Sequence, residues 1–150
     1  MATYFAYGSN MLEERLQARC PSAICQGIGS LEDHTLVFPR RSEVLRCGVA
    51  GIKEAIGEQV LGVLYHISFA DLRRLDQFEG TASGAYYREE VDILLPDGST
   101  QRAFVYVATD TGRRYRPSRE YLSFLVEGAE EHNLPPEYVE RLRRVPILKE

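Results

Sequence analysis

Apolar residues recur along this chain at two different spacings, which divide it into strand-like and helix-like segments. Short runs rich in Val, Ile, Tyr and Phe, bounded by turn-forming or charged residues, predict strands. The predicted strands are Thr3–Tyr7, Ala23–Leu31, Thr35–Phe38, Gly48–Glu54, Gln59–Ile67, Tyr86–Leu95 and Gln101–Ala108. Between the last two, the sequence Pro96-Asp97-Gly98 predicts a tight hairpin turn.

Apolar residues spaced three or four apart predict helices between these strands. The predicted helices are Met11–Arg19, Phe69–Phe78, Ser118–His132 and Pro136–Arg144. Consecutive strands with helices at intervals indicate an α+β fold, either a mixed curved sheet or a small β-barrel flanked by helices. The chain has 150 residues and no internal repeat, so a single domain over residues 1–150 is expected, with Pro39–Arg46 as a long loop.

Composition narrows the classes of partner and compartment. The net charge of −4 argues against nucleic acid as the main partner. The arginine clusters are interpreted as solvated surface, with a patch for phosphate or an acidic partner as the alternative. The start of the chain has no signal-peptide pattern and no apolar run is long enough to span a bilayer, so no membrane partner is expected. Three cysteines without a paired motif suit the reducing cytoplasm.

The first candidate site is Gly8-Ser9-Asn10, which follows the first predicted strand and begins a helix. Such a turn directs free backbone N–H groups, and the positive end of a helix dipole, at a bound carboxylate or carbonyl oxygen. The alternative is structural, because Asn10 with Glu13 three residues later resembles a capping box. Capping does not explain why a glycine precedes the serine, whereas close approach of a ligand to the backbone does.

The second candidate is Glu79, at the end of the helix that precedes Gly80. A carboxylate is disfavoured at the negative end of a helix dipole, and partial burial there raises its pKa toward the range of a general acid or base. An ordinary exposed glutamate in the last turn is the alternative. Asp76 is interpreted as a solvated residue or a partner of Arg73, and Phe78 as part of the apolar stripe of this helix.

Among nine tyrosines, Tyr86 is the most suggestive, because it begins a strand just after the loop that leaves Glu79. Its hydroxyl is therefore expected near the carboxylate. Most other tyrosines suit the core, with a satisfied hydroxyl. The three histidines have no ligand spacing, so no metal is expected, and no base is identified that would make Cys25 or Cys47 a nucleophile.

These segments together resemble the gamma-glutamylcyclotransferase family, also described as AIG2-like. The resemblance rests on three blocks in the family's order, which cover nearly the whole chain: Tyr4–Asn10; Leu75–Gly80 followed by Ser83–Tyr86; and Pro117–Tyr121 leading to Gly128-Ala129 and Leu134–Tyr138. Arg46–Ala50 matches the family's glycine-rich segment only loosely, and Pro39–Arg46 is shorter than in the animal enzymes. These departures leave the leaving group of the substrate open.

The resemblance implies a lyase that needs neither metal nor cofactor. In this family the α-amine of a γ-glutamyl substrate attacks its own γ-carbonyl, which gives 5-oxoproline and a released amino acid or amine. By resemblance Glu79 is the catalytic acid/base, and Tyr7, Gly8, Ser9 and Asn10 hold the glutamyl group and its oxyanion. Tyr86 and Tyr121 line the pocket by the same resemblance.

Two alternatives to this function remain. One is a non-enzymatic domain of the same fold that binds a small acidic metabolite. The other is a family enzyme that acts on a γ-glutamyl amine or another protected amine. The oligomeric state also stays open, with a homodimer as one alternative.

Overall fold

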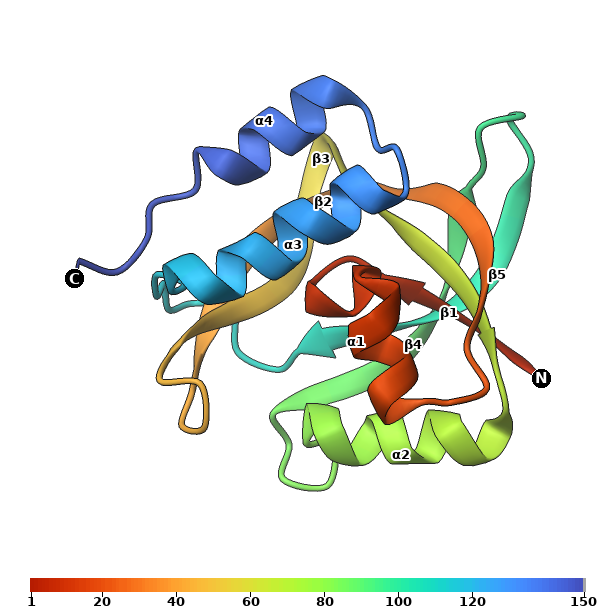
Figure 1. The fold of residues 1–150 in the computed structure, drawn as a ribbon, viewed down its shortest axis with the longest axis horizontal. Coiled ribbons are helices and arrows are strands. Elements are labelled where there is room, and N and C mark those ends of the chain that lie inside the picture. Colours follow the sequence, from red (N-terminus) through yellow and green to blue (C-terminus); the bar gives the residue numbers. More distant parts are fainter. Residues whose placement is uncertain (150) are drawn as a thin grey trace.

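The computed structural model describes residues 1–149 and shows a closed five-stranded barrel with helices packed around it (Figure 1). The strands are β1 (Ala2–Ala6), β2 (Ile24–Ser42), β3 (Cys47–Ile67), β4 (Tyr86–Leu94) and β5 (Thr100–Ala108). The helices are the 3-10 turn η1 (Ser9–Met11), α1 (Glu13–Arg19), α2 (Phe69–Glu79), α3 (Arg119–Glu131) and α4 (Pro136–Arg143). The expected α+β fold with a small barrel is confirmed.

The strands follow the order β1, β3, β2, β4, β5 around the barrel, and β5 closes onto β1. All neighbours are antiparallel except β1 and β5, which are parallel and meet where Tyr4 lies opposite Phe104. Closure pairs both sides of β1, which leaves no free sheet edge at this strand. The end of β1 is thereby fixed at the rim of the barrel, where the Gly8-Ser9-Asn10 segment follows.

Two strands are much longer than the hydrophobic pattern predicts, because each joins two predicted strands. β2 spans Ala23–Leu31 and Thr35–Phe38 almost entirely, and β3 spans Gly48–Glu54 and Gln59–Ile67. The predicted breaks are irregularities within continuous pairing. At the main one Asp33 has a φ of 59°, and its carboxylate accepts a hydrogen bond from the backbone of Gly57 at 3.0 Å. A local excursion of this kind looks like a loop in the sequence.

The prediction of a long loop at Pro39–Arg46 is wrong. β2 continues to Ser42 and β3 begins at Cys47, so only a four-residue hairpin turn lies between them. The backbone N–H of Arg46 donates to the carbonyl of Ser42 at 2.7 Å, and Arg46 has a φ of 57°. Polar residues at the tip of a hairpin suit a solvent-facing ribbon as well as they suit a loop, which explains the error.

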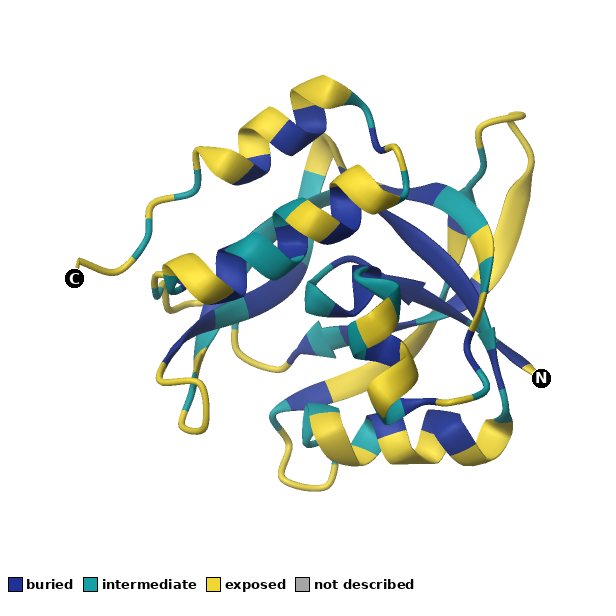
Figure 2. Cartoon of the chain, viewed as in Figure 1, coloured by how far each residue is buried: buried dark blue, intermediate teal, exposed yellow. Residues whose placement is uncertain are grey.

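α3 packs with its apolar face against the barrel and against η1 (Figure 2). Its buried residues are Tyr121, Leu122, Leu125, Gly128 and Ala129. A Cβ atom at Gly128 would lie 2.7 Å from the backbone nitrogen of Leu12 and 2.8 Å from the Cβ of Met11. Gly128 therefore lets the helix backbone approach η1 closely, and this contact holds the turn after β1 in place.

A search of residues 1–149 finds no helix with the length and apolar character that crossing a bilayer requires.

Candidate active site

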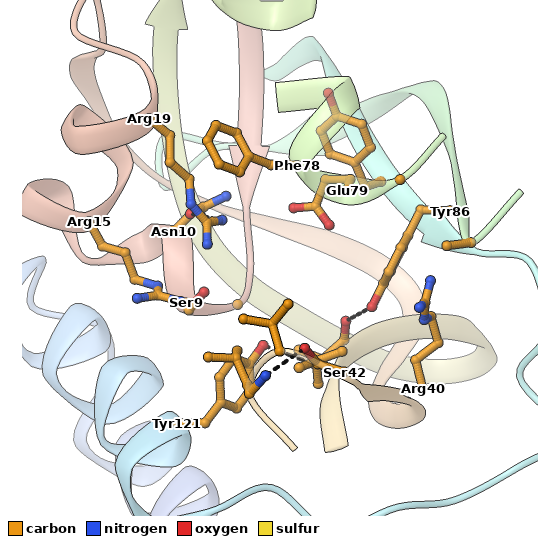
Figure 3. A pocket seen from close by; sticks show the side chains of 18 of the residues that line it. Ser9, Asn10, Arg15, Arg19, Arg40, Ser42, Phe78, Glu79, Tyr86 and Tyr121 are labelled. Atoms are coloured by element: carbon orange, nitrogen blue, oxygen red, sulfur yellow. Dashed lines mark hydrogen bonds between the residues drawn. The ribbon is translucent and has the colours of Figure 1, made fainter. Parts of the chain in front are cut away.

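A pocket of about 580 Å³ opens beside the end of β1 (Figure 3). Its walls come from the η1 turn, α1, the β2–β3 hairpin, the end of α2, the start of β4 and α3. All of the site residues predicted from the sequence line it: Tyr7, Gly8, Ser9, Asn10, Glu79, Tyr86 and Tyr121. The fold thus brings together residues from three distant parts of the chain, in a cavity large enough for a small metabolite.

The position of Glu79 is fixed by the two ends of α2. At the N-terminus the side chain of Ser68 accepts a hydrogen bond from the backbone of Asp71 at 3.1 Å, which caps the helix. At the C-terminus Gly80 adopts a left-handed conformation, with φ 71° and ψ 40°. Its N–H donates to the Gln77 carbonyl, and the N–H of the next residue, Thr81, donates to the carbonyl of Asp76, as in a Schellman motif. The predicted helix end at Gly80 is confirmed.

Asp76 is not a solvated residue and its partner is not Arg73, so that interpretation is wrong. One carboxylate oxygen of Asp76 accepts a hydrogen bond from the hydroxyl of Tyr106 at 2.6 Å, and the other lies 2.7 Å from a guanidinium nitrogen of Arg88. These partners come from β5 and β4, which the helical pattern does not reveal. Asp76 therefore fastens the last turn of α2 to the barrel, one turn before Glu79.

The carboxylate of Glu79 points into the pocket (Figure 3). Burial raises the pKa of Glu79 from an ordinary value near 4.5 to about 7, while the positive charges of Arg19 and Arg40 oppose this rise. A carboxyl group with a pKa near neutrality exchanges protons readily at the pH of a cell. The predicted rise in pKa is borne out by the structure.

The turn after β1 presents unused backbone donors to the pocket. The N–H groups of Met11 and Leu12 donate to the carbonyls of Gly8 and Ser9, at 3.0 and 3.3 Å, whereas within residues 1–149 the N–H groups of Ser9 and Asn10 have no backbone acceptor. A Cβ atom at Gly8 would lie 3.3 Å from the Cβ of Ala50, so the glycine lets the backbone of the turn approach Ala50 closely. The arrangement suits an oxyanion or a carboxylate.

Two details of this turn differ from the sequence predictions. The helix does not begin at Met11, because a single 3-10 turn precedes α1. Asn10 is not a cap: its amide nitrogen donates to the hydroxyl of Tyr4 at 3.1 Å, and its amide oxygen accepts from Arg19 at 3.2 Å. Asn10 is 4% exposed, and its side chain orders two other residues that line the pocket.

The three tyrosines predicted for the site differ in what their hydroxyls do. Tyr7 donates to the Tyr106 carbonyl at 2.6 Å, and Tyr86 donates to the Ala50 carbonyl at 2.7 Å. The hydroxyl oxygen of Tyr121 instead accepts from the Ala50 N–H at 3.0 Å, so its own proton stays available to a ligand (Figure 3). Burial raises the pKa of Tyr121 to about 12, which keeps this donor protonated at neutral pH.

Three arginines that the sequence analysis did not assign to the site also line the pocket: Arg15, Arg19 and Arg40. Arg15 packs its guanidinium 4.4 Å from the ring centre of Phe124, and its buried Nε has no hydrogen-bond partner in the described structure. Arg15 and Arg19 are four residues apart on α1, so their shared helix face was a usable signal. Arg40 belongs to the Arg40-Arg41 cluster, which the sequence analysis interpreted as solvated surface, and for Arg40 that interpretation is wrong.

Phe78 is not part of the apolar stripe of α2, and that expectation is wrong. It is 59% exposed at the pocket, with the guanidinium of Arg19 4.9 Å from the centre of its ring. Leu72 and Leu75 are buried as predicted. The interaction between the arginine and the ring orders a cation beside Glu79, which hydrophobic spacing alone does not indicate.

No group of three or more histidine, cysteine or acidic side chains within residues 1–149 is arranged to hold a metal ion. The polar groups that line the pocket are Glu79, the tyrosines, the arginines and the backbone groups of the turn after β1.

Comparisons with known proteins agree with this geometry. Residues 59–142 match the AIG2-like family. A gamma-glutamylcyclotransferase of Bos taurus is 36% identical over 146 residues, which cover 95% of this chain and 77% of the relative. The corresponding Homo sapiens protein is 35% identical with the same coverage. A solved structure of a gamma-glutamyl cyclotransferase superposes with a TM-score of 0.95, at 33% identity, and covers 99% of this chain and 90% of the other. The chain therefore belongs to the gamma-glutamylcyclotransferase family.

Proposed function

We propose that this enzyme converts a γ-glutamyl amino acid into 5-oxoproline and a free amino acid, with Glu79 as the proton carrier. The observation that carries this proposal is the placement of a carboxyl group with a pKa of about 7 in the same pocket as free backbone donors. The first can move protons at neutral pH, and the second can stabilise negative charge on a carbonyl oxygen.

The reaction requires two protons to pass from one nitrogen to another. The substrate's α-ammonium group loses a proton to become a nucleophile, and its nitrogen attacks the γ-carbonyl carbon to close a five-membered ring. The new ring nitrogen loses a second proton as the C–N bond to the leaving group breaks. The leaving nitrogen gains both protons. Glu79 can relay them in turn, because its pKa lies close to neutrality.

Negative charge develops on the γ-carbonyl oxygen when the ring closes. We assign the backbone N–H groups of Ser9 and Asn10 and the hydroxyl proton of Tyr121 to this oxygen. A Cβ atom on Gly8 would lie 3.7 Å from the Tyr121 hydroxyl, so the hydroxyl and the turn face the same small volume. Donors fixed in advance stabilise the transition state without reorganising during the reaction. Because the attack is intramolecular, folding the substrate into a reactive shape supplies much of the remaining acceleration.

The charge of the pocket favours a γ-glutamyl amino acid over a γ-glutamyl amine. Arg15 and Arg19 lie on the same side of the pocket as Ser9, and Arg40 lies beside Tyr86 (Figure 3). We assign the first pair to the α-carboxylate of the glutamyl group. We assign Arg40 to a second carboxylate, that of the leaving amino acid, because Arg40 forms no ion pair with a side chain of residues 1–149. A γ-glutamyl amine has no such carboxylate.

The compartment belongs to the same proposal. Cys20, Cys25 and Cys47 are all free thiols in the described structure, which suits the reducing cytoplasm, where we place the enzyme.

The test is to replace Glu79 with glutamine and to measure 5-oxoproline by mass spectrometry. A γ-glutamyl amino acid is the substrate. We expect Glu79→Gln to lower kcat by about 10²–10⁴-fold, the usual contribution of a positioned acid or base. Glu43→Gln is the matched control, because Glu43 also lines the pocket but is exposed on the hairpin turn and pairs only with Arg41. Full turnover by a folded Glu79→Gln protein would exclude the proposed role of Glu79.

The same assay separates catalysis from simple binding. If γ-glutamyl compounds raise the melting temperature of the wild-type protein but yield no 5-oxoproline over hours, the protein binds such compounds without converting them.

A further inference from the structure

A cysteine and a histidine that the proposed reaction does not use lie in contact outside the pocket. Cys25 is near the start of β2, and His132 follows the last turn of α3. The Sγ atom of Cys25 lies 3.6 Å from Nδ1 of His132, within hydrogen-bond range for sulfur. Neither residue lines the pocket that contains Glu79.

The hydrogen bonds of Tyr65 determine which nitrogen of His132 carries the proton. The hydroxyl of Tyr65 donates its only proton to the carbonyl of Met11 at 2.8 Å. Nε2 of His132 lies 3.0 Å from the same hydroxyl oxygen, which is left as an acceptor. We therefore assign the proton of the neutral ring to Nε2. Nδ1 then carries a lone pair, and that lone pair faces the thiol of Cys25.

Two carboxylates and the end of a helix lie close to the ring of His132. A carboxylate oxygen of Glu131 lies 3.4 Å from Nε2, and the side chain of His132 is only 10% exposed. Glu13 on α1 is a second carboxylate near this cluster, since its charge also acts on Tyr65. His132 occupies the C-terminal end of α3, where the helix dipole favours cations. The distance of 3.6 Å between Nδ1 and Sγ places the ring to accept the proton of Cys25.

The other two cysteines have neither solvent access nor a base. Cys20 is 0% exposed and Cys47 is 1% exposed, whereas Cys25 is partly exposed. The thiol of Cys20 contacts the carbonyl of Asp71 at 3.5 Å, and burial raises the pKa of this thiol to about 11. Among the three cysteines, only Cys25 is a partly exposed residue with a neighbouring base.

We propose that Cys25 is a modification site that forms mixed disulfides with small disulfide compounds, with His132 as its base. Nδ1 of His132 takes the proton from Sγ, and the resulting thiolate attacks one sulfur of the small disulfide. A bond forms between Sγ and that sulfur while the original S–S bond breaks. The departing thiolate takes up the proton held by His132. A free small thiol reverses the step by the same exchange.

The network around Cys25 also reaches the turn of the active site. Tyr65 holds the carbonyl of Met11, at the end of η1, and the backbone N–H of Glu13 donates to Glu131 at 3.1 Å. Both contacts fix the junction between η1 and α1, directly after the unused donors of Ser9 and Asn10. An adduct on Cys25 displaces the ring of His132 and loosens this junction. Modification is therefore expected to lower turnover.

The site is tested by treating the folded protein with 2-hydroxyethyl disulfide at neutral pH and mapping the adduct by mass spectrometry. We expect Cys25 to be modified about tenfold or more faster than Cys20 and Cys47. In urea, where the fold is lost, the three thiols should react at similar rates. Faster modification of Cys20 or Cys47 in the folded protein would overturn the proposal.

The role of the base is tested by His132→Gln, with His34→Gln as the matched control, since His34 contacts only the carbonyl of Glu32. We expect His132→Gln to slow modification of Cys25 by about tenfold and His34→Gln to leave it unchanged. Should His132→Gln fail to fold, Tyr65→Phe supplies the test: it leaves Cys25 and His132 in place, removes the bond that selects the tautomer, and should slow the modification. Unchanged rates in a folded variant would overturn the role of His132.

The effect on the active site is measured as kcat before and after thiolation. We expect a decrease of several-fold in the wild-type protein that a reducing thiol reverses, and no decrease in Cys25→Ser treated in the same way. Turnover by untreated wild-type protein and untreated Cys25→Ser reports on the proposed reaction itself. The change on thiolation reports on its regulation, so the two can fail separately. If the fully thiolated wild-type enzyme turns over as fast as the untreated enzyme, the proposed coupling between Cys25 and the active site is wrong.

Discussion

Tyr86 and Tyr121 bind the two polar backbone groups of one residue, Ala50, in opposite hydrogen-bonding senses. Tyr86 donates to the carbonyl oxygen of Ala50 at 2.7 Å, whereas Tyr121 accepts from its N–H at 3.0 Å. Both tyrosines therefore fix the start of β3 as a wall of the pocket. Only Tyr121 keeps a hydroxyl proton that a substrate can use. The two residues, which sequence reasoning treated as similar lining positions, have different chemical roles.

This difference predicts that Tyr121→Phe and Tyr86→Phe affect stability alike but turnover unequally. Each removes one hydrogen bond to the buried backbone of Ala50, which should cost about 1–2 kcal/mol of unfolding free energy. Tyr121→Phe also removes a donor to the oxyanion, so its kcat should fall by about 10²-fold. Urea denaturation and 5-oxoproline assays separate the two effects. Equal losses of kcat in both variants would contradict the assignment.

The raised pKa of Glu79 predicts an acidic limb in the pH dependence of kcat/KM. Glu79 must be ionised to take the first proton, so kcat/KM should be half-maximal near pH 7, level off about one unit above it and fall about tenfold per unit well below it. Initial rates between pH 5 and pH 9 measure this limb. Glu43→Gln should leave its midpoint in place. A midpoint near 4.5, the ordinary value, would mean that the carboxyl group is not buried as described.

The same shift predicts how stability depends on pH. Because the pKa of Glu79 is higher in the folded state, the folded protein binds more protons than the unfolded chain between about pH 4.5 and pH 7, and stability falls as pH rises through this window. Glutamine cannot ionise, so Glu79→Gln removes this loss. The variant should gain stability relative to the wild type between pH 4 and pH 8, by roughly 3 kcal/mol at most. Thermal unfolding of both proteins at pH 4 and pH 8 tests this prediction. A stability difference between variant and wild type that is the same at both pH values would contradict it.

The sequence predicted the main features of the candidate site because they follow local rules. The carboxylate of Glu79 at a helix end, the left-handed Gly80 after it, and the Gly8-Ser9-Asn10 turn after a strand are all consequences of short-range backbone geometry. Such rules need only a few neighbouring residues. They predicted where the proposed proton carrier and the backbone donors lie along the chain, and the family resemblance indicated that they meet.

The features that were missed depend on contacts between distant segments. Asn10 suits a helix cap, but it orders Arg19 and Tyr4, which only the folded barrel brings beside it. Asp76 suits a surface position, but β5 supplies its partner Tyr106. The segment around Arg40 reads as a loop, because the pairing that makes it a strand lies on the other arm of the hairpin. Strand register and ion pairs between distant segments cannot be predicted from the local spacing of residue types.

Arg40 predicts the preference of the enzyme for its leaving group. Its guanidinium lies 5.6 Å from the ring centre of Tyr86 and acts electrostatically on Glu79, so it stands close to both the pocket wall and the proton carrier. If it binds the carboxylate of the leaving amino acid, Arg40→Gln should raise KM for a γ-glutamyl amino acid by about tenfold, corresponding to the loss of one charge-assisted contact. KM for a γ-glutamyl amine should change little. The measurement is the ratio of the KM values for the two substrates, compared between Arg40→Gln and the wild type.

Arg41→Gln is the matched control for this experiment. Arg41 is the next residue on β2, but it is exposed and pairs with Glu43 at 3.4 Å, and it is absent from the pocket lining. Its replacement removes the same charge from the same strand without removing a pocket contact, so both KM values should stay constant. The assays are run at pH 8, where Glu79 is ionised and a small change in its pKa has little effect. Equal increases in KM for the two substrates in Arg40→Gln would show that Arg40 does not bind the leaving group.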